Sequence, residues 1–396
     1  MAQLPTWADQ LAALDGVVDR LMTAWRPGGG TQAEIQDMNK YALSALASGY
    51  YSYAYTDARR PAFMPLWNYA SPQGGPNPDY VYSSTQVDPA GVYQVSGYRG
   101  TSRFVEITQQ QEDLPGTSLE PPKERPLRET RDLDEFTIGD DGSFSLILSA
   151  QRPDGYDGDW WRLDPRARRL LMRKCACDWK HEVDARVAIN RLDDPGQDMT
   201  PEEFASRFSD LSAWIEGRIL HEIRLVRYYR EHHGINVLTK STWIEQVGGL
   251  AKQAYYDGIH EIDDDEALIV TVPLPSKCRY WQILVADDRF MTVDWVNRQS
   301  SLNDAQAHVD SDGMLRAVVS KQDPGVHNWL DKAGYPWGII QMRLYQANEH
   351  PETTVKKVQV AEVARHLPPG TRFVTPAERH GQLRARREAA QLRQIW

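Results

Sequence analysis

Cysteine is scarce in this 396-residue chain, which contains only Cys175, Cys177 and Cys278. Three thiols cannot build a disulfide framework, and an odd number is typical of a protein from a reducing compartment. No run of about 18 apolar residues occurs, so the sequence predicts no membrane-spanning helix. The first ten residues include Asp9 and lack the basic segment and apolar stretch of a secretory leader. We therefore expect a cytoplasmic protein with no membrane partner.

Dense basic stretches are also missing from the main body of the chain. Its 45 Lys and Arg residues are outnumbered by 55 Asp and Glu residues, which gives a formal net charge of −10. Such a chain is a poor partner for nucleic acid, so we expect none. Hydrophobic residues make up 41% of the chain and charged residues 25%, as in a globular protein of two or three domains.

Several catalytic signatures are absent. There is no phosphate-binding loop ending in Gly-Lys-Ser/Thr, no Gly-x-Gly-x-x-Gly and no Gly-x-Ser-x-Gly, which argues against nucleotide chemistry and an α/β-hydrolase. His221-Glu222 begins like a zinc-protease motif, but Leu225 stands where the second histidine belongs. Cys175 and Cys177 near His181 match no common zinc spacing and are better read as structural thiols. We expect neither a metal nor an organic cofactor.

Hydrophobic periodicity predicts an α+β protein that is mainly β, with two antiparallel β-sandwich or jelly-roll-like regions joined by a long helix. The helix is well marked, because Thr200 and Pro201 suit its start and Gly234 its end. We predict five segments: an N-terminal helical segment over 1–55, a first β region over 56–195, a linking helix and connector over 196–260, a second β-sandwich region over 261–350 and a C-terminal helical tail over 351–396.

Short alternating runs between turn residues predict the individual strands. They are expected at 80–87, 91–98, 102–109, 136–138, 143–149 and 183–192 in the first region, and at 267–273, 279–286, 314–320 and 338–346 in the second. A short helical stretch is expected over 165–171. The tail helix follows a Thr375 cap and carries five arginines, at 379, 384, 386, 387 and 393, which is typical of an exposed arm. We expect any homo-oligomer to form through the terminal helices.

Two segments of the first β region combine titratable groups with aromatic residues. Asn77-Pro78-Asp79, followed by Tyr82, forms a rigid turn that could aim side chains into a site, or a plain Asx-turn at the start of a strand. In Asp178–Arg186, Trp179 precedes His181 and Glu182, and a His–carboxylate pair can supply acid–base catalysis near neutral pH. A charged strand end with ordinary ion pairs is the alternative.

Two polar loops stand out in the second β region. Asp294–Asn303 contains Asp294, Trp295, Asn297 and Arg298. The asparagine and the arginine could bind an anionic or carbonyl oxygen. Asp323–Asp331 contains His327, Asn328 and Trp329. Both loops could instead use these side chains only to hold their own shape.

These segments carry a family resemblance. Arg279–Gln282, Asp294–Asn303 and Asp323–Asp331 together resemble the bacterial family called domain of unknown function 1214 (DUF1214). Asn77-Pro78-Asp79-x-x-Tyr82 and Asp178-Trp179-x-x-Glu182 resemble the N-terminal half of the same long proteins, labelled with the related domain of unknown function 1254 (DUF1254). The resemblance runs from about residue 50 to residue 378. It implies a β-sandwich-rich protein with relatives in actinobacteria and sphingomonads that degrade steroids, terpenes and aromatics, and it names no reaction.

Our leading hypothesis is a cofactor-independent enzyme of the lyase, hydratase or isomerase type that acts on a hydrophobic small molecule, such as a terpenoid, steroid or aromatic catabolite. Asp79 or Glu182 would be the general acid/base, assisted by Tyr82 and His181, in a cleft between the two β regions. The substrate-binding residues would be Asn77, Trp179, Tyr280, Asp294, Trp295, Asn297, Arg298, Asn328 and Trp329. A glycan-active hydrolase or lyase with tryptophan platforms and a non-catalytic ligand-binding or scaffold protein remain the alternatives.

Overall fold

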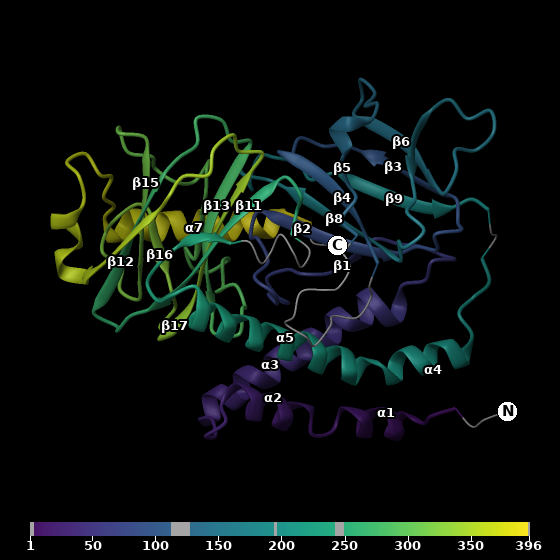
Figure 1. The fold of residues 1–396 in the computed structure, drawn as a ribbon, viewed down its shortest axis with the longest axis horizontal. Coiled ribbons are helices and arrows are strands. Elements are labelled where there is room, and N and C mark those ends of the chain that lie inside the picture. Colours follow the sequence, from purple (N-terminus) through teal and green to yellow (C-terminus); the bar gives the residue numbers. More distant parts are fainter. Residues whose placement is uncertain (1–3, 112–126, 194–195, 242–248, 395–396) are drawn as a thin grey trace.

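The computed structural model describes residues 4–111, 127–193, 196–241 and 249–394. Within them the protein is of the α+β class and mainly β, as predicted. Eighteen strands form four sheets in two β regions that lie one after the other along the molecule, and a layer of helices runs beneath both (Figure 1).

The first β region is a pair of facing sheets. Their order is β1-β2-β8-β4-β5 and β7-β6-β3-β9, and apolar residues such as Val95, Ile107, Leu146 and Met172 fill the space between them. The strands are β1 (Met64–Pro65), β2 (Tyr80–Gln86), β3 (Tyr93–Tyr98), β4 (Phe104–Gln110), β5 (Thr130–Asp132), β6 (Ser143–Ser149), β7 (Asp159–Arg162), β8 (Arg169–Cys175) and β9 (Arg186–Arg191). The strand expected at 136–138 is wrong, because β6 pairs with β3 and β7 instead.

The second β region has the same construction. Its sheets have the order β10-β11-β17-β13-β14 and β16-β15-β12-β18, around a core that includes Val270, Ile283, Leu315 and Met342. The strands are β10 (Thr239–Ser241), β11 (Gln253–Glu261), β12 (Glu266–Pro273), β13 (Tyr280–Asp287), β14 (Ser301–Asn303), β15 (Met314–Ser320), β16 (Trp329–Asp331), β17 (Trp337–Tyr345) and β18 (Thr354–Gln359).

The strand order of the first region is repeated in the second. Adding nine to each strand number of β1-β2-β8-β4-β5 gives β10-β11-β17-β13-β14, and the same addition turns β7-β6-β3-β9 into β16-β15-β12-β18. The parallel pairing of β6 with β7 recurs between β15 and β16. The described chain therefore contains one strand topology twice, as two units that meet through their five-stranded sheets.

Aromatic side chains fill the junction between these two sheets. Phe104 of the first unit stacks on Tyr345 of the second with ring centroids 4.3 Å apart, and Tyr280 lies 5.9 Å from both Phe104 and Tyr80. All four side chains are buried. The two units are thus joined by a packed contact.

The described helices lie near both termini of the chain and between the two β regions in the sequence. They are α1 (Trp7–Leu14), α2 (Val17–Trp25), α3 (Gln32–Gly49), a π-helical turn (Tyr50–Tyr55), α4 (Pro201–Ser209), α5 (Leu211–His232), α7 (Pro376–Leu392) and two 3₁₀ turns (Leu133–Glu135 and Val360–His366). None of the described helices has the length and apolar character needed to cross a membrane. The long helix expected at 201–233 is present and begins with the expected Thr200 capping box, but it is divided at Asp210 into α4 and α5.

The helical stretch expected over 165–171 is wrong, because residues from Arg169 onward form β8. This strand lies at the centre of its sheet and pairs with β2 on one side and β4 on the other. Leu170, Leu171 and Met172 are all buried, so the strand has no exposed face. A short apolar run that is buried on both faces has no period that distinguishes a strand from a helix.

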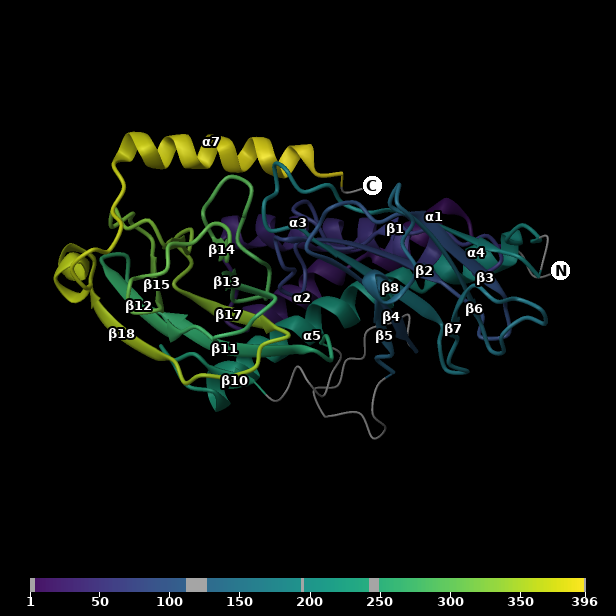
Figure 2. The ribbon, with the colours of Figure 1, turned by 90° about the horizontal axis from the view of Figure 1, so that it is seen from above.

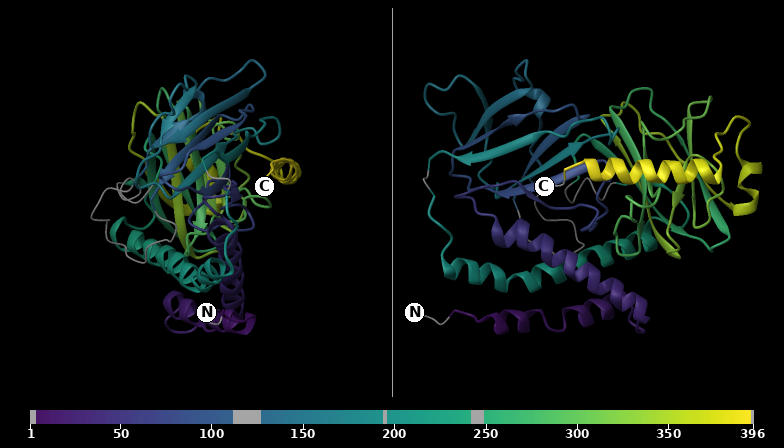
Figure 3. Two further views of the ribbon diagram at one scale, coloured as in Figure 1. Left: turned by 90° about the vertical axis from the view of Figure 1, so that its right-hand side faces the viewer. Right: turned by 180° about the vertical axis from the view of Figure 1, so that it is seen from behind.

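The C-terminal helix α7 is not the exposed arm that its composition suggested. It lies along one side of the molecule and crosses from the second β unit toward the first (Figures 2 and 3). Arg379, Arg386 and Arg393 are seven residues apart, which places them on one face of the helix, and each contacts the β units. Arg384 is exposed.

His260 of β11 lies in the second β unit and is expected to make the stability of the protein depend on pH. Its side chain is fully buried, and burial lowers its pKa to about 3. The unfolded chain binds this proton near pH 6.5, so stability is lost as the pH falls from about 6.5 toward 3. We expect the wild type to lose about 3 kcal/mol more stability between pH 7 and pH 4 than His260→Leu, measured by urea unfolding. The exposed His350→Leu variant should lose as much as the wild type, and equal losses in all three proteins would contradict the assignment.

Candidate functional site

Asp79 is the centre of a buried hydrogen-bond network at the junction of the two β units. It is 1% exposed and lies just before β2. Its Oδ1 accepts from Trp179 Nε1 and from Asn303 Nδ2, both at 2.7 Å, and its Oδ2 accepts from the Tyr280 hydroxyl at 2.6 Å. Burial raises the pKa of the Asp79 carboxyl, whereas the donors from Tyr280, Asn303 and Trp179 oppose that rise. The carboxylate therefore ties together segments of both units.

Asn77 extends this network to Tyr82. Its amide Nδ2 donates to the Tyr280 hydroxyl at 2.7 Å, and its backbone N–H donates to the Tyr82 hydroxyl at 3.0 Å. The Asn77 side-chain oxygen accepts from the Asp79 backbone N–H at 3.0 Å, which is the Asx-turn considered from the sequence. Thus the structure brings five of the expected site residues together, and it adds Asn303 to them.

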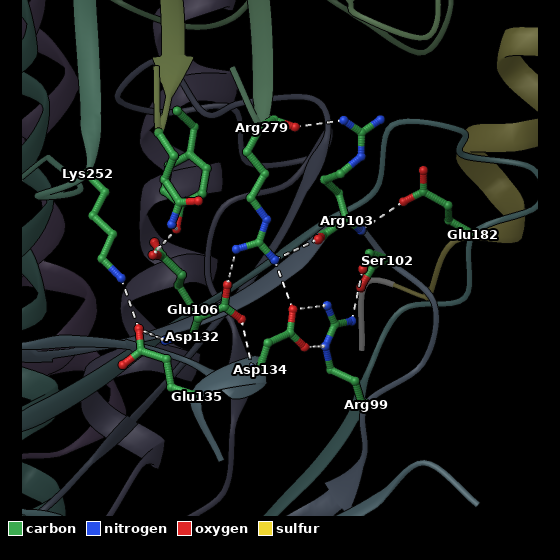
Figure 4. A network of polar contacts seen from close by, with 12 residues as sticks. Arg99, Ser102, Arg103, Glu106, Asp132, Asp134, Glu135, Glu182, Lys252 and Arg279 are labelled. Atoms are coloured by element: carbon green, nitrogen blue, oxygen red, sulfur yellow. Dashed lines mark hydrogen bonds and ion pairs between the residues drawn. The ribbon is translucent and has the colours of Figure 1, made fainter. Parts of the chain in front are cut away.

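Glu182 holds a loop in place. Its two oxygens accept from the backbone N–H groups of Arg103 and Asp178, both at 3.0 Å. Arg103 in turn donates to the Arg279 carbonyl at 2.8 Å (Figure 4). It also donates to Asp304 at 2.8 Å. Glu182 is therefore occupied by backbone donors.

Further ion pairs join the two units beside Glu182. Arg279 of the second unit pairs with Asp132 at 2.6 Å and with Asp134 at 2.9 Å, and Lys252 pairs with Glu135 at 2.9 Å (Figure 4). Charge-assisted hydrogen bonds of this kind fix the geometry of both partners. This network sets the orientation of one unit against the other.

The loop Asp294–Asn303 uses several of its polar groups locally. The Asp294 carboxylate accepts from the backbone N–H of Asn297 at 3.0 Å and from its side-chain amide at 2.8 Å. Arg298 pairs with Asp331 at 2.8 Å. Trp295 instead packs against Trp179 beneath α7.

The loop Asp323–Asp331 is held in the same way. The Asn328 side chain binds the backbone of His308 through both its amide and its oxygen, at 2.6 and 2.8 Å. The Trp329 indole N–H donates to Ser320. Asn328 and Trp329 thus stabilise the loops that contain them.

A cavity of about 380 Å³ lies under α7, between loops of the two β units. This volume lies within the range of small-molecule sites, about 300–1,000 Å³. Its walls combine apolar side chains with amides, imidazoles and a guanidinium: Cys177, Asp178, Trp179, Lys180, His181, Gln299, Leu302, Ala305, Gln306, His327, Gln382, Ala385, Arg386 and Ala389. The expected residues Trp179 and His181 face this cavity, whereas Asp79, Glu182, Asn328 and Trp329 do not line it.

Arg386 supplies a positive charge to this cavity. Its guanidinium donates to the Trp295 carbonyl and to the Ser301 hydroxyl, and it stacks 4.6 Å from the centre of the Trp179 ring. Burial lowers the pKa of Arg386 to about 10, so the group is cationic at neutral pH. Among the described residues it has no carboxylate within ion-pair distance. A half-buried, unpaired guanidinium in a cavity is suited to bind an anionic or strongly polar oxygen.

Two histidines border the cavity, and they differ in which ring nitrogen donates a hydrogen bond. The His181 ring Nδ1 lies 2.8 Å from Asp178 Oδ2, and this hydrogen bond lowers the pKa of the Asp178 carboxyl. A carboxylate can only accept, so Nδ1 carries the proton and Nε2 is left to act as a base. His327 is partly buried, and burial lowers its pKa, so its ring is neutral at neutral pH. Its Nε2 lies 3.0 Å from the Gln306 carbonyl, to which it must donate.

Sequence reasoning missed Arg386 and Asn303. The signal for Arg386 was the seven-residue spacing of Arg379, Arg386 and Arg393, which a count of basic residues hides. Asn303 is the last residue of a loop already selected, and nothing in its spacing marks it as a partner of Asp79. Among the described residues no group of three or more His, Cys, Asp or Glu side chains is placed to hold a metal ion.

The fold and this site define a protein of two like β-sandwich units, with a ligand-sized cavity closed by a C-terminal helix. The family model described as "Protein of unknown function (DUF1214)" matches residues 260–349, so the resemblance to DUF1214 is confirmed for this region of the chain. The DUF1254 resemblance of the N-terminal half stays a prediction.

Two solved structures are similar to this chain to different degrees. An uncharacterized protein from Burkholderia cenocepacia is 23% identical, with a TM-score of 0.79 over 90% of this chain and 97% of that one. A protein from Vibrio parahaemolyticus is 14% identical, with a TM-score of 0.45 over 86% of this chain and 100% of that one. None of the curated proteins matches this chain. The first likeness shows a shared fold and names no reaction.

Proposed function

We propose that the protein is a cofactor-independent enzyme of the lyase, hydratase or isomerase type, and that it acts in the cavity under α7 on a largely apolar small molecule with a carboxylate or carbonyl group. The observation that carries this proposal is the unpaired Arg386 in the same cavity as the His181–Asp178 pair. Apolar walls from Trp179, Leu302 and three alanines suit the body of a terpenoid or aromatic substrate.

Each polar group has a role in this proposal. Arg386 binds the substrate oxygen and stabilises the negative charge that develops on it when a neighbouring proton is removed. His181 Nε2 takes and returns that proton, while Asp178 fixes the ring in the correct tautomer. Gln306 Oε1, which is buried without a hydrogen-bond partner among the described residues, accepts from a substrate hydroxyl.

The proposal changes the role that the sequence suggested for two carboxylates. Asp79 and Glu182 are saturated by donors of the protein itself, so they position the Trp179 and Asp178 segments and do not meet the substrate. Tyr82 does not line the cavity under α7 and contributes instead to a second cavity between the units. The acid–base function moves to His181, which the sequence gave an assisting role.

The binding step can be tested with matched probes. We expect trans-cinnamate to bind at least 10-fold tighter than cinnamamide by calorimetry, because only the acid can pair with Arg386. Arg386→Met should remove this preference, and Arg384→Met, an exposed change on the same helix, should retain it. Equal affinities of acid and amide in the wild type would overturn the assignment of Arg386.

The catalytic step needs the natural ligand. Native mass spectrometry of protein purified from its own source, followed by denaturing extraction, identifies what is bound, and its conversion is then assayed. We expect His181→Asn to lower kcat by about 10²–10⁴-fold while the ligand still binds. His350→Asn is the exposed control. A ligand that binds but is never converted would favour the non-catalytic binding protein.

Self-association and a cytoplasmic location stay predictions. Of the two terminal helices, α1 is better suited to contact another copy, because α7 is packed on its own chain. Trp7 of α1 is 70% exposed and stacks on Phe208 of α4, with Leu4, Leu11 and Phe204 exposed beside it. Size measurement of a Trp7→Ser variant against the wild type tests this surface.

A further inference from the structure

Two buried arginines occupy equivalent places in the two β units. In the first unit Arg173 of β8 stands opposite Tyr82 of β2 and Glu106 of β4. In the second unit Arg343 of β17 stands opposite Tyr255 of β11 and Gln282 of β13. Adding nine to the strand numbers converts the first set into the second. Both arginines therefore lie on the faces through which the two five-stranded sheets meet.

Neither guanidinium forms an ion pair with a described residue. Arg173 is 7% exposed and donates once, to the Thr108 hydroxyl at 3.0 Å. Arg343 is 6% exposed and donates to the Gln282 side-chain oxygen at 3.0 Å and to the Gly75 carbonyl at 2.6 Å. In the described part of the chain no carboxylate lies within ion-pair distance of either group. An unpaired charge of this kind is costly to bury, and a counter-ion would offset the cost.

The acidic neighbour of Arg173 is engaged elsewhere. Glu106 faces Arg173 across the β4–β8 pairing, but its Oε1 accepts from the Tyr345 hydroxyl of the second unit. In the second unit the equivalent position is Gln282, which has no charge. Arg343 has an acidic neighbour of its own in Asp257 of β11, whose Oδ1 accepts from the Gln341 side chain at 2.7 Å. Among the described residues, neither Glu106 nor Asp257 lies within ion-pair distance of an arginine of this pair.

Both arginines line one cavity of about 130 Å³ between the units. Tyr82, Tyr255, Gln253 and the backbone of Gly74 and Gly75 complete the walls that matter here. The Tyr82 hydroxyl accepts from the Asn77 backbone N–H, which leaves its own proton free to be donated. One water occupies about 30 Å³ in the liquid, so this cavity holds about four waters or one small anion.

We propose that this cavity binds an oxyanion group, a carboxylate or a phosphate, between Arg173, Arg343 and the Tyr82 hydroxyl. A guanidinium presents paired N–H donors that match two oxygens of such a group, and two guanidiniums from opposite sheets would hold it from both sides. The site is separate from the cavity under α7 and does not rest on the function proposed for it. Its occupant is either a free ion or the acid group of a larger molecule.

Thermal unfolding with added anions tests the site. We expect 10 mM inorganic phosphate or acetate to raise the Tm of the wild type by about 3–6 °C over chloride at equal ionic strength, because a ligand of the folded state stabilises it. Arg173→Met should abolish this rise. Arg162→Met, an exposed change on β7, should retain it.

Each outcome decides the proposal. A rise that depends on Arg173 and saturates in calorimetry with inorganic phosphate or acetate supports a free ion. If only phenyl phosphate gives an Arg173-dependent rise, the group belongs to a larger molecule. Rises of equal size in the wild type and Arg173→Met, or no rise with any of the three anions, would overturn the site. If Arg173→Met fails to fold, the Tm measurements are repeated with Arg173→Gln and with Thr108→Val. The second variant removes the hydrogen bond between Thr108 and Arg173.

Discussion

Replacing Asp79 by alanine is expected to lower the free energy of unfolding by about 3–5 kcal/mol, which urea denaturation followed by tryptophan fluorescence would measure. The substitution leaves the Trp179 indole, the Asn303 amide and the Tyr280 hydroxyl buried without their acceptor. Each unsatisfied buried donor costs about 1–3 kcal/mol, and partial rearrangement of the site recovers some of that sum.

The control for this change is Asp154→Ala. Asp154 is exposed, and removal of such a side chain is expected to change stability by less than about 0.5 kcal/mol. Asp79→Asn keeps the shape but turns an amide N–H₂ toward donors, so an intermediate loss is expected. An Asp79→Asn variant with full stability and no turnover of the identified ligand would return Asp79 to the catalytic role that the sequence suggested.

The second large effect is expected at Arg393, near the end of α7. Its guanidinium pairs with Asp184 at 2.8 Å and donates to the Asp79 carbonyl at 2.9 Å, and both charged side chains are nearly buried. Arg393→Met leaves the Asp184 carboxylate buried without its partner, so we expect a loss of about 3–5 kcal/mol in the free energy of unfolding. Differential scanning calorimetry would show it as a lower Tm.

A double-mutant cycle separates this pair from general packing. Asp184→Asn alone should also destabilise the protein, and the double variant should lose less than the sum of the two single changes, since the partners interact directly. Arg384→Met, on the exposed side of the same helix, is expected to have almost no effect. Additive losses at Arg393 and Asp184 would contradict the buried ion pair.

Local patterns predicted much of the fold because they depend on residues close in sequence. Alternating runs placed β2, β4, β6, β13 and β15 to within a few residues, and the Thr200 and Thr375 capping boxes marked the starts of α4 and α7. Residues 165–171 failed, since the neighbours that make β8 a central strand lie far away in the chain. The repeated strand order was not visible either, because equivalent positions carry different side chains, such as Glu106 and Gln282.

The candidate site was predicted in part for the same reason. Asn77, Asp79 and Tyr82 form a short motif, and Trp179 and Tyr280 were selected with them, so the sequence contained the members of the network. The sequence does not reveal how these side chains are oriented. In the structure the Asp79 carboxylate accepts hydrogen bonds from three protein donors, and His181 faces the cavity under α7. That depends on the packing of α7, whose inward-facing arginines look like ordinary surface charges when they are counted by composition.

The repeated strand topology helps to explain why the junction between the units contains charged and hydrogen-bonding side chains. Two like units that meet through equivalent faces have the geometry of a twofold dimer interface, here with both subunits in one polypeptide. A free dimer must recover the translational and rotational entropy of association, which favours a large apolar contact. Covalent linkage makes the encounter intramolecular, with the high effective concentration of tethered partners. The junction can therefore contain charged and hydrogen-bonding groups at its centre. Because the two units are encoded separately, a residue of one unit can also change while the equivalent residue of the other stays the same.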